Sequence, residues 1–379
     1  MHQKVKRFRL GLAVAAAGLM LVAACGSSTD SNSKSSGTSG SSSEKGLRET
    51  RGPAGETATA VADLQVTDDV IKKATGKAKT AAIMWPDSTP FFSAAAKGIE
   101  DTFKKLDIEV VSVTDSGFDS AKERDNFETV FALKPDIIVA LIVDPVASAE
   151  TFRPAVEAGT KLALLSNVPK GYKQGQDYVS LVTDDLFAMG SQAAKALAGA
   201  MDEKGKVGYI YHDADFYVTN QRDRAFKTII SEDYPNMEIV AEAGMADPAR
   251  VEEIASAMIT QHPDMTGIYV PWTPPAEDVL AAIRAAGRDD IKLTTLDLSV
   301  PSALDMLQGG PTVAMVADAS YEIGRGLASA VALDLAGEKV PPFIVAPAVT
   351  VTKDNLVEAW KDSLGVEPPA QLLEAVNKN

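Results

Sequence analysis

The stretch TAAIMWPDSTPFF, residues 80–92, contains the unit from which the fold is built. Its first six residues, Thr80–Trp85, are almost wholly apolar, which is typical of a parallel strand buried on both faces. After the polar turn, apolar residues recur at helical spacing at Phe91, Ala95 and Ile99 and form one face of a helix. The stretch therefore predicts a strand, a loop and a helix that packs back onto the strand.

The same alternation begins at residue 77, restarts after about residue 184 and continues to about residue 352. Two successive series favour a doubly wound α/β fold with two parallel-sheet domains. The further strands are predicted at Ile108–Val113, Asp136–Val143, Lys161–Ser166, Tyr178–Thr183, Lys206–Tyr211, Glu238–Ala243, Gly267–Trp272, Ile291–Asp297, Thr312–Ala317 and Ala346–Thr352.

The first 25 residues form a pattern that is typical of a secretory signal. A basic start precedes an apolar run from Leu10 to Ala24, and Cys25 follows this run directly. The run has about 15 residues, which is short for a bilayer span of about 20. Cys25 in this setting resembles the lipobox of bacterial lipoproteins, in which the cysteine becomes the first residue of the mature chain and carries the lipid. The alternatives are an ordinary signal peptide and an uncleaved anchor helix.

The segment after Cys25 has the composition of a flexible tether. Ser27 to Ser43 is almost entirely Ser, Gly, Thr, Asn and Asp, so it cannot bury enough apolar surface to fold. We therefore expect a signal peptide at 1–24 and a lipid anchor with a flexible linker at 25–76. Residues 47–76 are polar and rich in Ala and Thr, and a helix near Val66–Lys73 is the alternative for that part.

The composition excludes several classes of function. The formal net charge of −15 argues against nucleic acid and against electrostatic binding to anionic lipid. A single cysteine leaves no intramolecular disulfide and no thiolate metal site, and three histidines argue against a zinc centre. The chain also lacks a serine elbow, a P-loop and a glycine-rich dinucleotide loop after the first strand. No cofactor, metal or catalytic residue is expected.

The residues around the first strand resemble a known family. Trp85–Phe92, with Ala96, Lys97 and Gly98 behind it, resembles the first strand, loop and helix of ribose-type periplasmic binding proteins, the sugar-binding subunits of ABC importers. Further matches follow in the same order, at Asp144–Pro145, Thr183–Asp185, Asn220–Phe226, Leu296–Asp297 and Asp318 with Glu322–Gly324. The resemblance covers residues 77 to about 352, and the order and spacing of the motifs carry it.

The resemblance implies a topology with two lobes joined by three hinge strands, and a ligand bound in the cleft between them. The first lobe would comprise 77–183 plus 319–347, and the second lobe 184–318 plus 348–365. The hinges would lie near Thr183–Asp185, Asp318–Ser320 and Val345–Ala348, and residues 366–379 would form a C-terminal tail. In open α/β sheets ligands bind outside the carboxyl ends of the strands, where the candidate polar residues fall.

The resemblance also implies that aromatic side chains line the cleft. Phe91 and Phe92 follow the first strand, and in the family they stack on the apolar face of a sugar. Trp85 and Trp272 each end a predicted strand, in opposite lobes, and would enclose a ring between them. A structural role is the alternative for all four: the phenylalanines would staple the helix to the core, and each tryptophan would fill the interior of its lobe.

Charged residues are expected to bind the rim of the ligand. Arg222 stands where the family carries its ligand arginine, whose rigid fork of donors suits paired hydroxyls or a carboxylate; Arg224 is the competing choice. Asp297 matches the family's ligand aspartate, and an ionised carboxylate only accepts hydrogen bonds, so it selects hydroxyl-rich ligands. The other polar residues predicted to line the site are Thr89, Asp144, Ser166, Asn167 and Asp318.

The chain departs from the ribose pattern, which favours another monosaccharide, a polyol or a ligand with a basic group. Asp144, Asp297 and Asp318 around one arginine would leave a negative cleft, and an amino sugar as the ligand is our hypothesis from this charge. The departures fall at Thr89, Ser166–Asn167, Trp272 and Asp318.

These observations predict a monomeric, lipid-anchored solute-binding protein on the outer face of the cell membrane. It would capture a sugar, a polyol or a related hydroxylated ligand by hinge closure and deliver it to the permease and ATPase of an ABC importer. The alternative is a sensing protein that presents the sugar to a membrane receptor or kinase. A glycosidase would also need paired carboxylates, but here they fall at binding-cleft positions. A sugar-responsive repressor shares the fold, but the secretion signal excludes it.

Overall fold

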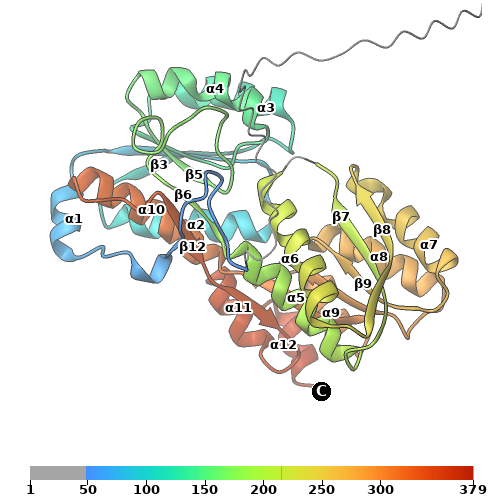
Figure 1. Ribbon diagram of the computed structural model, residues 1–379. Coiled ribbons are helices and arrows are strands. Elements are labelled where there is room, and N and C mark those ends of the chain that lie inside the picture. The colour runs from blue at the N-terminus through green and yellow to red at the C-terminus, as the bar shows by residue number, and fades with distance from the viewer. Residues whose placement is uncertain (1–47, 215, 379) are drawn as a thin grey trace, which may run out of the picture. The chain divides into compact units, whose positions relative to one another are not determined.

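The computed structural model describes residues 48–214 and 216–378, which form two α/β lobes, each built on one sheet (Figure 1). The predicted signal peptide, Cys25 and the tether from Ser27 to Ser43 lie outside the described residues. Within the described part of the chain, no helix is long and apolar enough to cross a membrane.

The sheet of the first lobe has seven parallel strands. Strands β4 and β6 are buried along their whole length, as expected for strands covered on both faces, whereas the edge strand β3 is not. The order across the sheet is β1 (Thr59–Ala60), β12 (Phe343–Ala346), β6 (Leu181–Asp184), β5 (Lys161–Leu165), β4 (Ile137–Ala140), β2 (Thr80–Trp85) and β3 (Glu109–Asp115).

Helices cover both faces of this sheet (Figure 1). One face carries α3 (Ser120–Ala132) and α4 (Pro145–Glu157), whose buried phenylalanines pack on the strands. The other face carries α1 (Asp68–Ala74), α2 (Pro90–Lys104) and α10 (Ser320–Ala336), and the short 3-10 helix η1 (Val61–Asp63) adds Val61 to the same core.

Two glycines from separate sequence motifs meet where α2 crosses α10. A Cβ built on Gly98 of α2 would lie 2.2 Å from the carbonyl oxygen of Tyr321, and one built on Gly324 of α10 would lie 1.9 Å from that of Ala95. No real Cβ tolerates such a distance, so only glycine lets the two helix backbones approach this closely. This packing joins a helix from the start of the chain to one from its last quarter.

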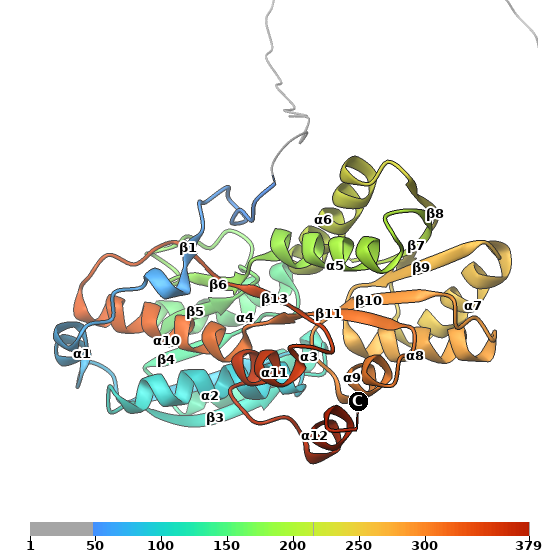
Figure 2. The same cartoon turned by 90° about the horizontal axis from the view of Figure 1, so that it is seen from below.

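The sheet of the second lobe has six strands, parallel except for β13, which runs antiparallel to β11 (Figure 2). Their order is β13 (Ala348–Val351), β11 (Thr312–Asp318), β10 (Lys292–Leu296), β9 (Met265–Val270), β7 (Gly205–His212) and β8 (Met237–Met245).

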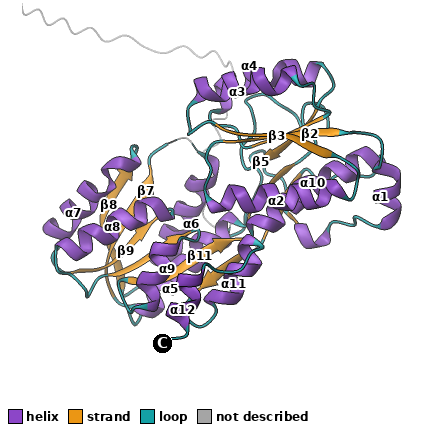
Figure 3. Ribbon diagram, turned by 180° about the vertical axis from the view of Figure 1, so that it is seen from behind, coloured by secondary structure: helices purple, strands orange, loops and turns teal. Residues whose placement is uncertain are grey.

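Helices also flank the second sheet (Figure 3). One core is formed with α5 (Leu186–Ala200) and α6 (Tyr217–Asp233). The remaining α-helices pack in two further clusters, and they are α7 (Val251–Gln261), α8 (Thr273–Ala285), α9 (Val300–Leu307), α11 (Leu356–Leu364) and α12 (Ala370–Val376). The short 3-10 helix η2 (Pro248–Arg250) precedes α7 and has no buried residue.

The chain passes from one sheet to the other within a single residue near its end. The stretch Ala346–Thr352, predicted as one strand, is divided between β12 of the first sheet and β13 of the second. Pro347 lies between them, and its lack of a backbone N–H prevents a continuous ladder. The first sheet also contains β6, after which the chain enters α5 of the second lobe.

The fold includes more of both ends of the chain than the sequence indicated. The linker was expected to reach residue 76, but β1 pairs with β12, and Leu64, Val70 and Ala74 are buried in the first core. The expected C-terminal tail, 366–379, contains α12, whose Leu372 is fully buried. In both segments a few apolar residues among polar ones are enough to hold the segment to the fold. Each of these residues packs against a larger element, which supplies the rest of the contact.

Candidate functional site

Four charged side chains meet where strands of the two sheets end. Asp184 is the last residue of β6, Asp318 is the last residue of β11, Asp297 directly follows β10, and Arg222 belongs to α6. Nη1 of Arg222 lies 3.5 Å from Oδ1 of Asp297 and 3.6 Å from Oδ1 of Asp318. We call these four residues the charged cluster. It combines one residue of the first sheet with three of the second lobe.

Helix packing places Arg222 in this cluster. A Cβ on Gly190 of α5 would lie 2.0 Å from the carbonyl oxygen of Arg222, so the two helices touch at this point and no other residue fits. Nη1 of Arg222 also lies 3.7 Å from the sulfur of Met189 on α5. The arginine is therefore held against a packed helix pair, and its side chain is only 8% exposed.

The cluster carries more carboxyl groups than the guanidinium can neutralise. Burial raises the pKa of Asp184 to about 6 and that of Asp318 to about 7. Burial, followed by the neighbouring carboxyl of Asp318, raises the pKa of Asp297 well above its ordinary value. Burial alone would lower the pKa of Arg222, but the three aspartates raise it, so the guanidinium stays charged.

The cluster also has unused hydrogen-bonding capacity. Among the described residues, Oδ1 of Asp184, Oδ1 of Asp318 and Nε of Arg222 are buried and have no hydrogen-bond partner. Buried polar atoms in folded proteins are nearly always paired. The side chain of Asp297 is 26% exposed, so it is the member that a molecule outside the core reaches first.

Ser166 and Asp297 occupy corresponding positions in the two lobes. Each directly follows a central strand, and each has a positive φ, 60° for Ser166 and 65° for Asp297. Ser166 donates its N–H to the carbonyl of Val182 at 2.8 Å, and Asp297 donates to Val316 at 2.9 Å. This left-handed backbone, which costs of order 1–3 kcal/mol, is typical of residues at functional sites.

Ser166 and its neighbour Asn167 are both held by side-chain hydrogen bonds. The hydroxyl of Ser166 is 2.9 Å from that of Thr183, and the amide nitrogen of Asn167 donates to the carbonyl of Ile142 at 3.2 Å. Both Ser166 and Asn167 are buried. Thr89 is half-buried and precedes α2 without capping it through its side chain.

The aromatic candidates divide into buried and half-buried residues. Trp85 and Phe92 are buried in the first core, with ring centroids 5.6 Å apart, and the indole N–H of Trp85 has no partner among the described residues. Phe91 is half-buried, with its ring 4.9 Å from that of Phe92. Trp272 is half-buried, and its ring lies 5.0 Å from that of His212.

Asp144 does not join the charged cluster. Its carboxylate caps α4, where it accepts the backbone N–H groups of Val146 and Ala147 at 2.8 and 2.7 Å. The expected trio of Asp144, Asp297 and Asp318 around the arginine is therefore wrong, and Asp184 takes the place of Asp144. The sequence Asp144–Pro145 itself is a common helix start, because aspartate is a good N-cap and proline suits the first helical position.

Two further residues near the strand ends were missed. Asp184 falls within the matched motif Thr183–Asp185, so its place at a strand end could have been recognised. His212 ends β7, one residue beyond the predicted strand. Its N–H donates to Asp223 at 2.9 Å, its Nδ1 lies 2.8 Å from the hydroxyl of Thr219, and burial lowers its pKa.

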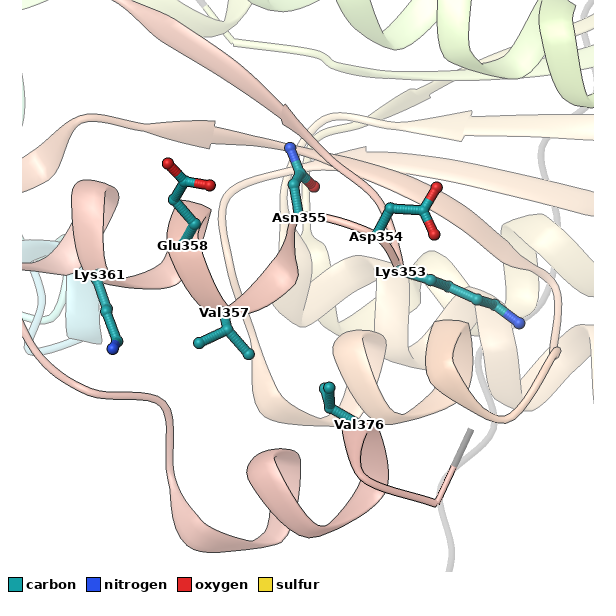
Figure 4. A pocket seen from close by; sticks show the side chains of 7 residues that line it. All are labelled: Lys353, Asp354, Asn355, Val357, Glu358, Lys361 and Val376. Carbon is teal, nitrogen blue, oxygen red and sulfur yellow. The ribbon is translucent and has the colours of Figure 1, made fainter.

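A separate hollow of about 350 Å³ lies at the C-terminal side of the second lobe (Figure 4). It contains none of the predicted site residues and none of the charged cluster. Figure 4 shows its polar side chains around the start of α11 and the end of α12. It is lined by Lys353, Asp354, Asn355, Val357, Glu358, Lys361 and Val376.

Known proteins share both the sequence pattern and the fold. The periplasmic binding protein domain family matches residues 81–339. The chain is 24% identical to the D-allose-binding periplasmic protein of Escherichia coli K12 over 294 residues, 73% of this chain and 92% of that protein. It is also 24% identical to the ribose import binding protein RbsB of the same strain over 288 residues, 75% of this chain and 93% of that protein.

Solved structures with this fold include proteins that bind sugars. One is an ABC transporter solute-binding protein from Agrobacterium vitis bound with α-D-tagatopyranose, with a TM-score of 0.67, 20% identity, and coverage of 77% of this chain and all of that chain. Another is the arabinose-binding protein AraP from Geobacillus stearothermophilus, with a TM-score of 0.66, 22% identity, and coverage of 74% and 99%.

Proposed function

The chain belongs to the periplasmic binding protein domain family, and from this premise we propose that it captures a sugar, a polyol or a related hydroxylated ligand and delivers it to an ABC importer. Like its relatives, it is a solute-binding protein and not an enzyme. The names of those relatives include allose, ribose, tagatose and arabinose, so the substrate class we propose is a small carbohydrate.

The charged cluster is the single observation that supports this function best. A guanidinium offers a planar fork of donors, and carboxylates accept pairs of hydroxyls, so together they suit the polar rim of a sugar. The half-buried aromatic rings, Phe91 and Trp272, offer apolar surface for the C–H face of the same ligand. We propose that the ligand-binding residues are Trp85, Thr89, Phe91, Phe92, Asp144, Ser166, Asn167, Asp184, Arg222, Trp272, Asp297 and Asp318.

Binding would act through movement of the lobes. The charged cluster contains Asp184 at the end of a first-lobe strand and Asp297 in the second lobe, so a ligand that contacts both favours the closed arrangement. The hinges we propose are the places where the chain changes sheets, namely Asp184–Asp185, Asp318–Ser320 and Ala346–Ala348. The closed form would then be recognised by the permease.

We propose that the protein works as a monomer on the outer face of the cell membrane, held by lipid on Cys25. The resemblance of Leu21–Cys25 to a lipobox supports this proposal. Attachment by lipid would also keep the binding protein close to its permease. Cys25→Ala should release the protein or leave it unprocessed, and the ligand affinity should stay the same. A variant that loses its signal peptide and still remains membrane-bound would contradict the anchor.

A thermal-shift screen of the purified protein tests the substrate class. The probes are D-ribose, D-allose, L-arabinose, D-tagatose, sorbitol, D-glucose and D-glucosamine, each over a concentration series, followed by calorimetry on those that act. A ligand that binds only the folded state raises the melting temperature by mass action. Failure of every carbohydrate to shift the melting temperature would refute the proposed function. A preference for glucosamine over its neutral counterpart glucose would support a ligand with a basic group.

A further inference from the structure

The residues that precede the first βα unit form a segment that contacts both lobes. We call residues 48–61 the strap. It lies outside residues 81–339, which match the family, so the family does not account for it. Figure 2 shows it in dark blue, between the helices α5 and α6 at one end and strand β1 at the other.

One end of the strap is bonded to the helices of the second lobe. Thr50 is buried, and its hydroxyl donates to Oδ1 of Asp185 at 2.5 Å and accepts the N–H of Phe187 at 2.9 Å. The hydroxyl of Tyr217 on α6 donates to the carbonyl of Arg51. These bonds seat the strap against the first turns of α5 and α6.

An ion pair extends this attachment along α6. The guanidinium of Arg48 lies 2.6 Å from Asp233 and 3.0 Å from Glu232, at the last turn of the helix. Both carboxylates are partly exposed, so the pair contributes little by itself. The buried hydroxyl of Thr50 is therefore the stronger point of attachment.

The middle of the strap is a closed turn. Arg51 pairs with Thr57 in an antiparallel bridge, and Gly52 donates its N–H to the carbonyl of Glu56 at 3.0 Å. The carboxylate of Glu56 accepts the N–H of Ala54 at 2.8 Å. Because its own backbone bonds are satisfied, the turn is an ordered connector with little slack.

The other end of the strap is part of the first lobe. Thr59 and Ala60 form β1, which pairs with Ile344 and Val345 of β12. Val61 is 1% exposed and packs in the core formed with α10. The same β12 leads through Pro347 into the second sheet, so the strap runs beside one of the places where the chain changes lobes.

We propose that the strap is a restraint on lobe movement, which holds the second-lobe helices α5 and α6 to the edge of the first sheet and limits how far the lobes open. A segment bonded to two bodies raises the effective concentration of each at the other, so opening beyond its reach requires its bonds to break. Lobe opening in proteins of this architecture is absorbed by a few hinge residues, and a parallel connection beside the hinge opposes that rotation.

Small-angle X-ray scattering of the ligand-free, purified protein tests the restraint. Thr50→Val removes the hydroxyl that bonds to Asp185 and Phe187, and Tyr217→Phe removes the bond to Arg51. We expect each variant to have a larger radius of gyration than the wild type, and the double variant the largest. A radius equal to that of the wild type in both variants would overturn the proposal.

A matched control lies in the same segment. Thr57→Val makes the same chemical change, but among residues 48–214 and 216–378 the hydroxyl of Thr57 accepts only from Arg51 within the turn, at 2.7 Å. The radius of gyration of this variant should equal that of the wild type, and an equal increase in Thr57→Val and Thr50→Val would also overturn the proposal. Thermal unfolding identifies a variant that fails to fold. If Thr50→Val fails to fold, Tyr217→Phe, which keeps the aromatic ring, decides the outcome.

The radius of gyration is measured without ligand. A negative result would therefore refute the restraint and leave the proposed function unchanged.

Discussion

The carboxyl groups of Asp184 and Asp318 interact directly, although the two residues end strands of different sheets. Both are almost fully buried, and burial raises the pKa of Asp184 to about 6 and that of Asp318 to about 7. An aspartate in an unfolded chain titrates near pH 3.9, so each group binds its proton more tightly when the protein is folded. The stability that these protons contribute is complete below about pH 4 and is lost as the pH rises through about 7.

We expect Asp318→Asn to reduce this dependence on pH. The amide cannot ionise, so the free energy of unfolding of the variant, relative to the wild type, should rise by on the order of 2 kcal/mol between about pH 4 and pH 8. Urea unfolding of both proteins at several pH values across this range measures the difference. Parallel stability curves would show that Asp318 is ionised throughout in the folded protein.

Arg222→Lys should weaken ligand binding by about 10- to 100-fold, because it keeps the charge but loses the planar fork that serves two acceptors. Calorimetry with the ligand found in the thermal-shift screen measures the loss. Arg224→Lys is the control, since it changes an exposed side chain two residues further along the same helix. An equal loss of affinity in the two variants would mean that neither arginine has the specific binding role.

Gly324→Ala should destabilise the first lobe by about 2–4 kcal/mol, because its Cβ would overlap the backbone of α2. Gly199→Ala is the matched control on α5, where a Cβ meets no atom within 4 Å. That variant should be stabilised by about 0.5 kcal/mol, since alanine favours the helix over glycine. Urea unfolding measures both changes, and a neutral Gly324→Ala would mean that the two helices separate without cost.

Leu372→Ala should cost about 2–4 kcal/mol, because the side chain is fully buried between α12 and the second lobe. Glu374→Ala, at an exposed position two residues later, should change the free energy of unfolding by less than about 0.5 kcal/mol. Comparison of the two variants by urea unfolding shows whether the last helix belongs to the cooperative core or unfolds separately.

The sequence predicted the regular parts of the fold because buried parallel strands are continuous apolar runs. Thr80–Trp85 has the predicted bounds in the structure, and most other strands differ by one to three residues at an end. The strap was missed because one buried hydroxyl and a two-residue strand leave no periodic pattern. Contacts between residues far apart in the chain, such as Thr59 with Ile344, are visible only when the fold is complete.

The site was predicted less completely, for a similar reason. Arg222, Asp297 and Asp318 do meet, as the family resemblance indicated, and the two aspartates lie at strand ends as predicted. Asp144 also follows a strand, but whether such an aspartate caps the next helix or faces other charges depends on its side-chain rotamer, which composition does not determine. The burial of Trp85 and Phe92 likewise follows from the packing of α2 and could not be told from their spacing.

The pairing of β1 with β12 sets the order in which the protein is completed during synthesis. Thr59 leaves the ribosome among the first residues of the folded part, and its partner Ile344 follows only near the end of the chain. The same is true of α2, whose close partner α10 begins at Ser320. A nascent chain that stops before residue 320 lacks both the helix and the strand that complete the first core. The second lobe in turn lacks β13, α11 and α12, which follow β12 in the chain. Neither lobe can therefore finish folding until the end of the chain has been translated, and the first lobe waits the longest between its first strand and its last.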